Sequence, residues 1–412
     1  MTGWGIVGGS PCGRQDAARD RLTSPPGNGI MDLISMGQSR SFLGDRMMMI
    51  RRKLFAKIAV AIGLAGLGLL LTVLASNDPE GTSRVFAPWS RSVSVYLSRL
   101  FAFLPISMAE VLVYALGLFI LVALTLSVVN IFRQRSLWPL LNWIASVALV
   151  AAGLFFIFFS LWGLNYYATP LREKEEITES PVEMLYDTSV WLRDEMNRLA
   201  PLAPRDQNDV CDAGGYAALA PRAALGYDAL VEQGGDFVAN LSPPKRVIFP
   251  SLFVRFGISG IYAPFTGESI VDTDSIDAHL PFTLCHELAH RQGVAPEDEA
   301  NYYAFLACTA HPDPTYRYSG YYLAFIYCSN ALGREDGDLG AQLWSEVSPL
   351  VHADIAAQRA HRAKYEGPLR TVGESTNNAY LQAVGQKGVK SYGLVVDLLI
   401  AAYQRGAGVP GE

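Results

Sequence analysis

Charged residues, histidines and cysteines are all scarce in this chain of 412 residues. Only 17% of the residues are charged, against roughly 25% in soluble domains, so a wholly soluble protein is not expected. The net charge of −6 is small for this length and no basic aromatic patch is present, which argues against a nucleic-acid binder. Residues 165–412 contain no internal repeat or low-complexity tract and suffice for one sizeable domain.

Charge is missing most clearly from residues 58–75, 111–132 and 137–164, which contain no charged side chain. Each stretch can span, or nearly span, a hydrocarbon core roughly 30 Å thick. We therefore expect a membrane region over residues 47–164, with three transmembrane helices at about 54–75, 109–132 and 137–164. The alternative, helices buried in a large soluble core, is disfavoured by the length and purity of these stretches.

The first apolar stretch follows Arg51, Arg52 and Lys53, which resembles the start of a signal peptide, but it exceeds the usual 7–15 residues of a signal core. We expect it to stay as an anchor. Residues 1–46 are rich in Gly, Ser, Pro and Arg and lack a periodic apolar face. They are expected to be a disordered extension or an over-extended gene start ahead of Met47.

Positive charge near the spans predicts the orientation. Basic residues precede the first span, and Arg133 and Arg135 lie between the second and the third. With these in the cytoplasm, residues 165–412 form an extracytoplasmic domain of a multi-pass cell-membrane protein. Arg84, Arg91 and Arg99 lie between the first two spans, on the side that this orientation places outside the cytoplasm. They weaken the charge difference on which the predicted orientation depends.

The segment between the first two spans carries apolar side chains at helical spacing, namely Trp89, Val93, Tyr96, Leu97, Leu100 and Leu104. This pattern predicts a helix lying along the membrane surface, next to the lipid bilayer. A groove that binds a protein partner is the alternative.

His286-Glu287-Leu-Ala-His290 is the motif with the clearest chemistry. Residues i and i+4 share a helix face, so His286 and His290 can hold one Zn²⁺ while Glu287 reaches a water on the metal. Pro281 suits the first turn of this helix and Gly293 its C-terminal end. Fe²⁺, Co²⁺ or Mn²⁺ can occupy similar ligands.

A catalytic zinc keeps three protein ligands and an open position, so one more ligand is expected. Glu297 is the choice, because Glu297-x-x-Ala300-Asn301 resembles the E-x-x-x-D helix of gluzincin metallopeptidases, in which the glutamate binds zinc. Asn301 stands where that pattern has aspartate, which implies weaker support for a ligand histidine. Glu299 is the competing ligand.

The remaining patterns predict a mainly helical α+β, zincin-like domain. Residues 182–200 and 342–366 suit helices, and 246–249, 257–262 and 263–271 suit short strands ahead of the metal helix. An edge strand beside the metal could pair with an extended peptide.

The chain resembles the bacterial membrane proteins of the domain of unknown function 3810 family. The matching motifs are residues 162–167, 264–268, 281–290, 297–301 and 390–393. The resemblance implies a membrane-anchored, zinc-dependent peptidase.

We therefore expect hydrolysis of peptide or protein substrates by a zinc-activated water, with Glu287 as general base. Tyr392 is a candidate oxyanion donor, followed by His311 and His352. A catalytically inactive zinc-binding sensor or scaffold is the alternative. A transporter finds support only in Glu110, an isolated acid at the edge of the second span. The oligomeric state is left open.

The four cysteines of the outer domain allow disulfides in an oxidising compartment, but buried free thiols are an equal alternative. These cysteines are Cys211, Cys285, Cys308 and Cys328. Zinc ligation by Cys285 is not expected, because it points about 100° away from His286 around the helix.

Overall fold

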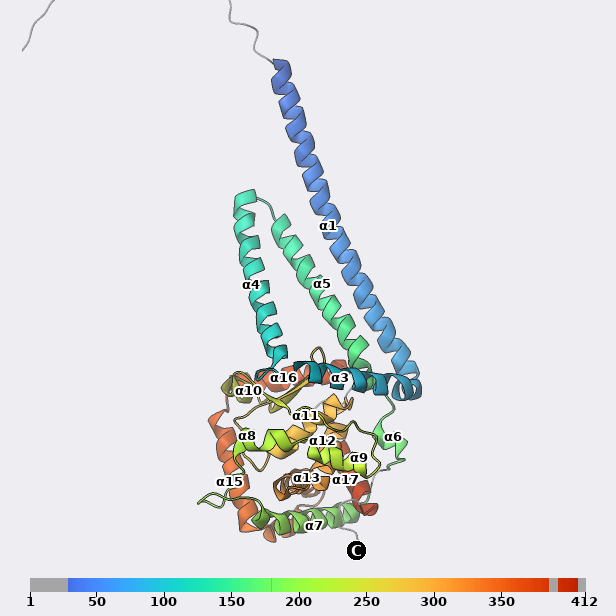
Figure 1. Ribbon diagram of the computed structural model, residues 1–412, viewed down its shortest axis with the longest axis vertical. Coiled ribbons are helices and arrows are strands. Elements are labelled where there is room, and N and C mark those ends of the chain that lie inside the picture. The colour runs from blue at the N-terminus through green and yellow to red at the C-terminus, as the bar shows by residue number, and fades with distance from the viewer. Residues whose placement is uncertain (1–28, 179, 385–391, 407–412) are drawn as a thin grey trace, which may run out of the picture. The chain divides into compact units, whose positions relative to one another are not determined.

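The computed structural model describes residues 29–178, 180–384 and 392–406 (Figure 1). The chain forms two compact units, residues 1–56 and 57–412. The second unit contains the membrane helices from Lys57 onward and the whole of the following domain.

Three helices are long and apolar enough to cross a membrane, as expected, although the third ends at Leu161 and not at residue 164. They are residues Arg51–Asn77 of α1 (Gly29–Asn77), α4 (Met108–Gln134) and α5 (Trp138–Leu161). Lys57 donates to Asn142 Oδ1 at 2.9 Å and Ser146 Oγ at 2.7 Å, so the charge inside the first span is paired with polar groups of α5. Such pairing is how a cation is tolerated at membrane depth.

Helix α1 begins earlier than the sequence indicates. Residues 29–46, expected to be disordered, continue the helix of the first span toward the N-terminus. Extending an existing helix needs no new nucleation, so a segment without an apolar face can still be helical. The prediction for residues 1–28 lies outside the described residues.

The elements between the first two spans are α2 (Pro79–Gly81), η1 (Thr82–Phe86) and α3 (Ala87–Phe101). The elements after α5 are η2 (Gly163–Tyr167), α6 (Leu171–Lys174), α7 (Val182–Leu199), η3 (Ala200–Leu202), α8 (Gly215–Leu219), η4 (Ala220–Arg222), α9 (Leu225–Glu232), β1 (Lys245–Arg246), α10 (Pro250–Arg255), β2 (Gly260–Ala263), β3 (Glu268–Val271), α11 (Leu280–Arg291), α12 (Glu297–Ala310), α13 (Pro314–Glu335), α14 (Gly337–Ser345), α15 (Pro349–Lys364), α16 (Pro368–Ala383) and α17 (Tyr392–Gln404).

The expected strands exist but are shorter than predicted, and they form a three-stranded sheet in the order β1-β3-β2. β1 runs parallel to β3, and β2 is antiparallel to it at the other edge. The helix expected over 342–366 is instead two helices, α14 and α15. Ser348 caps α15 and Pro349 begins it, and proline lacks the N–H that a continuous helix requires at that point.

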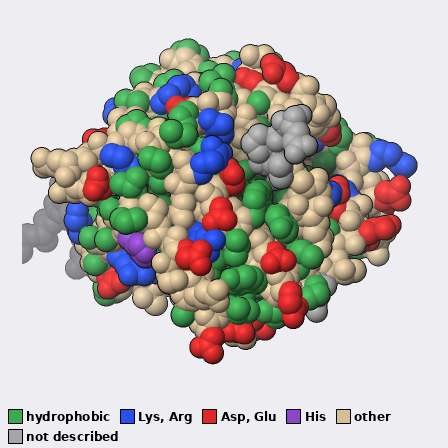
Figure 2. Space-filling view, turned by 90° about the horizontal axis from the view of Figure 1, so that it is seen from below, with side chains coloured by type: hydrophobic (Ala, Val, Ile, Leu, Met, Phe, Trp, Pro, Cys, Tyr) green, Lys and Arg blue, Asp and Glu red, His purple; other side chains and the backbone are tan. Residues whose placement is uncertain are grey.

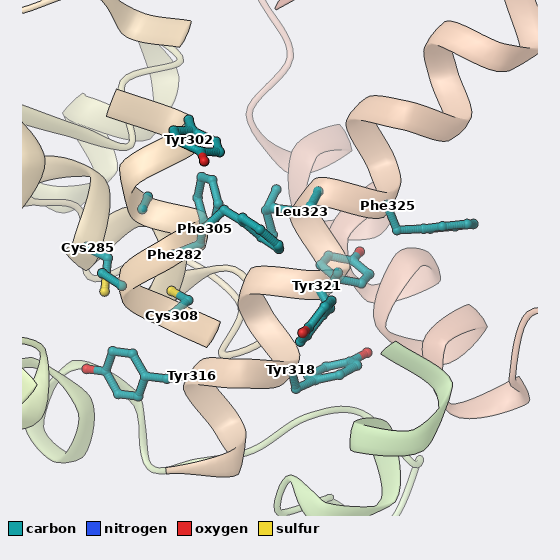
Figure 3. Close-up of a cluster of buried hydrophobic side chains, with 14 of the residues drawn as sticks. Phe282, Cys285, Tyr302, Phe305, Cys308, Tyr316, Tyr318, Tyr321, Leu323 and Phe325 are labelled. Carbon is teal, nitrogen blue, oxygen red and sulfur yellow. The ribbon is translucent and has the colours of Figure 1, made fainter. Parts of the chain in front are cut away.

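The core of the domain is built around α13, which packs against α7, α11 and α12. Aromatic side chains of α13 fill it, with Phe305 and Cys308 of α12 facing them (Figure 3). Cys285, Cys308 and the other two cysteines of the domain are buried and free, so the disulfide alternative is wrong. The packed α11–α13 layer supports the backbone of the His286–His290 motif.

The first turn of α4 is held by the sheet. Glu268 of β3 accepts hydrogen bonds from Met108 N at 3.1 Å and Ala109 N at 2.8 Å, two of the N–H groups left free at a helix start. Lys245 of β1 pairs with Glu268 at 2.6 Å and also donates to Phe101 O and Ile106 O. A carboxylate at this end of α4 is further favoured by the helix dipole.

Glu110 is not an isolated acid, which removes the one observation behind the transporter alternative. Its carboxylate accepts from Ile248 N at 3.0 Å and from the hydroxyl of Tyr114. The residue therefore fastens the start of α4 to the segment after β1.

Loss of the Glu268 charge should loosen this junction. Glu268 is 1% exposed, and removing one partner of a buried ion pair costs about 3–5 kcal/mol. We expect Glu268→Gln to lower the thermal midpoint of the full chain in detergent by about 10 °C. Glu183→Gln, at an exposed position of α7, is the matched control. Equal midpoints for the two variants would contradict the role of Glu268.

Candidate metal centre

Helix α11 presents the two histidines of the motif on one face. Pro281 lies in its first turn, and Gly293, with φ of +91°, follows its last turn in the left-handed region that favours glycine. The Nε2 atoms of His286 and His290 are 3.1 Å apart. The sharp turn at Gly293 then allows α12 to return beside α11.

The first residue of α12, Glu297, completes a cluster with the histidines. Its Oε2 lies 3.3 Å from His286 Nε2 and its Oε1 lies 3.6 Å from His290 Nε2. Ligand atoms 2.0–2.1 Å from a tetrahedral zinc are roughly 3.3 Å from one another, so these separations fit a zinc ion. Among the described residues, no other group of three or more His, Cys, Asp or Glu side chains converges in this way.

Each histidine has a further polar contact outside the cluster. His290 Nδ1 lies 2.7 Å from Val294 O, which holds the ring with Nε2 toward the cluster. The side chain of Asn301 hydrogen-bonds to His286, and Tyr327 donates to Asn301 Oδ1 at 3.4 Å. Such outer contacts fix the tautomer and orientation of metal-binding histidines.

The competing acid points elsewhere. Glu299 Oε1 accepts a hydrogen bond from Leu171 N at 2.6 Å, so this carboxylate caps α6. The structure therefore brings together His286, His290 and Glu297, and not Glu299. Cys285 faces the core on the far side of α11, where its Sγ lies 3.9 Å from Ala223 O.

The protonation of the cluster reflects burial and mutual charge. Burial disfavours the ionised form of Glu297, but the hydrogen bond with His286 and the charges of both histidines lower its pKa to about 2. Burial lowers the pKa of His290 to about 4, which keeps that imidazole neutral. For His286 the acidic neighbours outweigh burial and raise the pKa.

Glu287 is buried beside the edge strand. It is 3% exposed, and its Oε2 has no hydrogen-bond partner among the described residues. Burial raises its pKa to about 8. A Cβ at Gly260 of β2 would lie 2.4 Å from Glu287 Oε1, so only glycine lets the strand approach so closely. No sequence pattern marks Gly260 for this role.

Two tyrosines at the cluster were missed by the sequence patterns. The hydroxyls of Tyr166 and Tyr380 are 3.1 Å apart. Burial raises the pKa of both hydroxyls, and the charge of Glu297 adds to the increase in each. Tyr166 belongs to the 162–167 motif and could have been found there, whereas nothing near Tyr380 marks it.

The predicted oxyanion donors lie elsewhere or are not described. Tyr392 is the first residue of α17, and its side chain lies outside the described residues. Both ring nitrogens of His311 are engaged, by Arg222 O and Asp313 N. His352 of α15 lies beside Trp344 of α14.

The end of α5 contacts the metal helix directly. Trp162, the residue after the span, donates from Nε1 to His290 O at 3.1 Å. Its ring centroid lies 6.1 Å from that of His290. The cluster therefore lies within one side chain of the end of a membrane-spanning helix.

A family model described as "Protein of unknown function (DUF3810)" matches residues 86–400, well over half of the chain. No curated protein and no solved structure matches. The matched region contains the metal cluster, Glu287 and both tyrosines. The resemblance carried by the sequence motifs is confirmed, and the chain belongs to the DUF3810 family.

Proposed function

We propose that this protein is a membrane-anchored zinc metallopeptidase with a zincin-like domain. The observation that carries the proposal is the convergence of His286, His290 and Glu297 beside Glu287, a buried carboxylate that lacks a full set of partners. Leaving a buried acceptor unpaired costs about 1–3 kcal/mol or more, and proteins keep such groups mainly at functional sites.

Within this proposal His286, His290 and Glu297 would hold the metal, which when bound supplies a Lewis acid that activates water and polarises a carbonyl. Glu287, whose ionised form a cation held by the cluster would favour, accepts a proton from the attacking water as the new C–O bond forms. It then passes a proton to the leaving nitrogen as the C–N bond breaks, which releases a carboxylate and an amine.

The edge position of β2 suits an extended substrate. The strand pairs only with β3 within the described sheet, and Gly260 brings it against Glu287. A peptide laid along β2 would have its backbone beside the general base, and main-chain hydrogen bonds would supply sequence-tolerant affinity.

Tyr166 and Tyr380 are the donors best located to stabilise the developing oxyanion. Their hydrogen-bonded pair fixes the hydroxyl positions in advance, which is what electrostatic stabilisation requires. Tyr392 remains the sequence-based alternative.

The orientation follows the positive charge. Arg51, Arg52 and Lys53 precede the first span, and Arg133 and Arg135 lie at the link between α4 and α5. We propose that these residues are cytoplasmic and that the domain after α5 lies outside the cytoplasm.

Zinc content should show whether Glu297 or Glu299 is the third metal ligand. We expect about one zinc per chain in the purified full-length protein, and in Glu299→Ala. Glu297→Ala should bind zinc more than about 100-fold more weakly, because loss of even an outer contact costs 10–100-fold. Elemental analysis after dialysis against buffered zinc measures this. Retention in Glu297→Ala would exclude that ligand.

Glu287→Gln should keep the metal and lose turnover. Removing a general base costs about 10²–10⁴-fold, while the amide fills the same space. Cleavage of a proteome-derived peptide library by the full chain, read as new N-termini by mass spectrometry, measures the change. Unaltered cleavage in the variant would contradict the mechanism. Zinc binding without cleavage by the native chain would favour the sensor or scaffold alternative.

Tyr380→Phe should lower kcat by about 10²-fold with zinc content unchanged, because an oxyanion donor acts in the transition state. Tyr392→Phe is the direct comparison in the same assay. A full kcat in Tyr380→Phe together with a loss in Tyr392→Phe would reverse the assignment.

A further inference from the structure

Helix α3 buries polar side chains and exposes apolar ones, which is the reverse of an ordinary surface helix. Its serines Ser90, Ser94 and Ser98 are buried against the domain. Ser90 donates to Leu161 O at 2.7 Å, and Ser94 accepts from the hydroxyl of Tyr262. The outward side chains are large and apolar, with Trp89 47% and Tyr96 67% exposed. This confirms the amphipathic helix predicted from sequence and directs its apolar face away from the domain.

Helix α10 lies at the same level as the start of the second span. The ring centroid of Phe249, immediately before α10, is 5.8 Å from that of Tyr114 in the second turn of α4. Phe249 is 55% exposed, and Leu252 is also exposed. These apolar side chains therefore lie beside the first turns of a helix that is long and apolar enough to cross a membrane.

Helix α16 continues this surface. It packs on the end of α10, where a Cβ at Gly373 would meet Phe256 O and Arg370 lies beside Gly257. Its outer side exposes Leu369, Val372 and Tyr380. Figure 1 shows α3, α10 and α16 along the end of the domain from which α4 and α5 extend.

The exposed apolar residues of the domain are concentrated there. Nine large hydrophobic side chains are exposed among the described residues after α5, and seven of them form this surface with the β2–β3 hairpin. The seven are Phe249, Leu252, Ile261, Phe265, Leu369, Val372 and Tyr380. The face seen from the opposite end has charged side chains of both signs distributed across it (Figure 2). We call α3 and these seven residues the apolar collar.

The collar reaches the metal centre. Ile261 follows Gly260, which touches Glu287, and Tyr380 pairs with Tyr166. Trp162 links the end of α5 to His290. The side chains next to the cluster therefore include residues of the same end of the domain as the collar.

We propose that the apolar collar is inserted in the headgroup region of the lipid bilayer and opens the metal centre toward it. The collar is continuous with three spans, so the bilayer is the partner that covers it. We further infer that the substrate is a polypeptide segment lying in the headgroup region, such as the juxtamembrane part of a membrane-anchored protein. This inference rests on the proposed peptidase function.

Lipid quenching tests the collar without reference to activity. In the full chain with Cys12→Ser, single variants Val372→Cys and Leu252→Cys are labelled with an environment-sensitive fluorophore and reconstituted in phosphatidylcholine nanodiscs. Leu202→Cys, 52% exposed against 53% for Val372, is the matched control on η3 beyond α7. The described native cysteines are buried and should not react.

Nitroxide-labelled lipid should quench the collar labels at least about threefold more than the label at residue 202. Equal quenching at all three positions would overturn the insertion. A blue-shifted label at residue 372 that lipid does not quench would also overturn it, since a second copy or another protein would then cover the surface.

The substrate class is tested with one cleavable peptide, either free or attached to a transmembrane helix in the same nanodisc. The tethered form should be cleaved at least about tenfold more efficiently, and Val372→Asp should reduce only that difference. Equal efficiency would overturn the substrate inference while leaving the peptidase intact. Cleavage of neither form would overturn both the substrate inference and the peptidase proposal. The quenching result would still decide whether the collar is inserted.

Discussion

The hydrogen bonds between Glu268 and the first turn of α4 fix the domain relative to that helix, which is long and apolar enough to cross a membrane. Glu268 lies on the central strand β3, and the next residue, Ser269, donates to Glu287 O of the metal helix at 2.7 Å. Two adjacent residues thus connect α4, the sheet and α11, the helix of His286 and His290. Because the side chains of a strand alternate, such neighbours reach opposite faces of the sheet. This short path sets the distance between the His286–His290–Glu297 cluster and the start of α4.

The centre itself is costly to assemble. Glu287 and the Glu297–His cluster are buried together, and an unpaired buried carboxylate is among the least favourable groups in a folded protein. The protein offsets this with a well-packed aromatic layer behind α11 and α12, shown in Figure 3. A bound cation would complete the balance of charge and would thereby stabilise the folded protein.

Local patterns were sufficient for much of the structure. The three spans follow from hydropathy, and the face shared by His286 and His290 follows from helix geometry. The break at Pro349 was missed because a proline can also begin a helix within an apparently continuous pattern. Gly260 and Tyr380 could not be found in this way, because their importance arises from approaches between segments distant in sequence.

The contacts of α4 have a consequence for the order of assembly. Met108 and its partner Glu268 are separated by 160 residues. At roughly 5–20 residues per second, α4 is synthesised on the order of 10–30 s before the strand that caps it. During that interval the inserted helices await the sheet, with the serine face of α3 also uncovered. The first turn of α4 therefore receives its cap only when the sheet has formed, so the junction between this helix and the domain is among the last contacts to be completed.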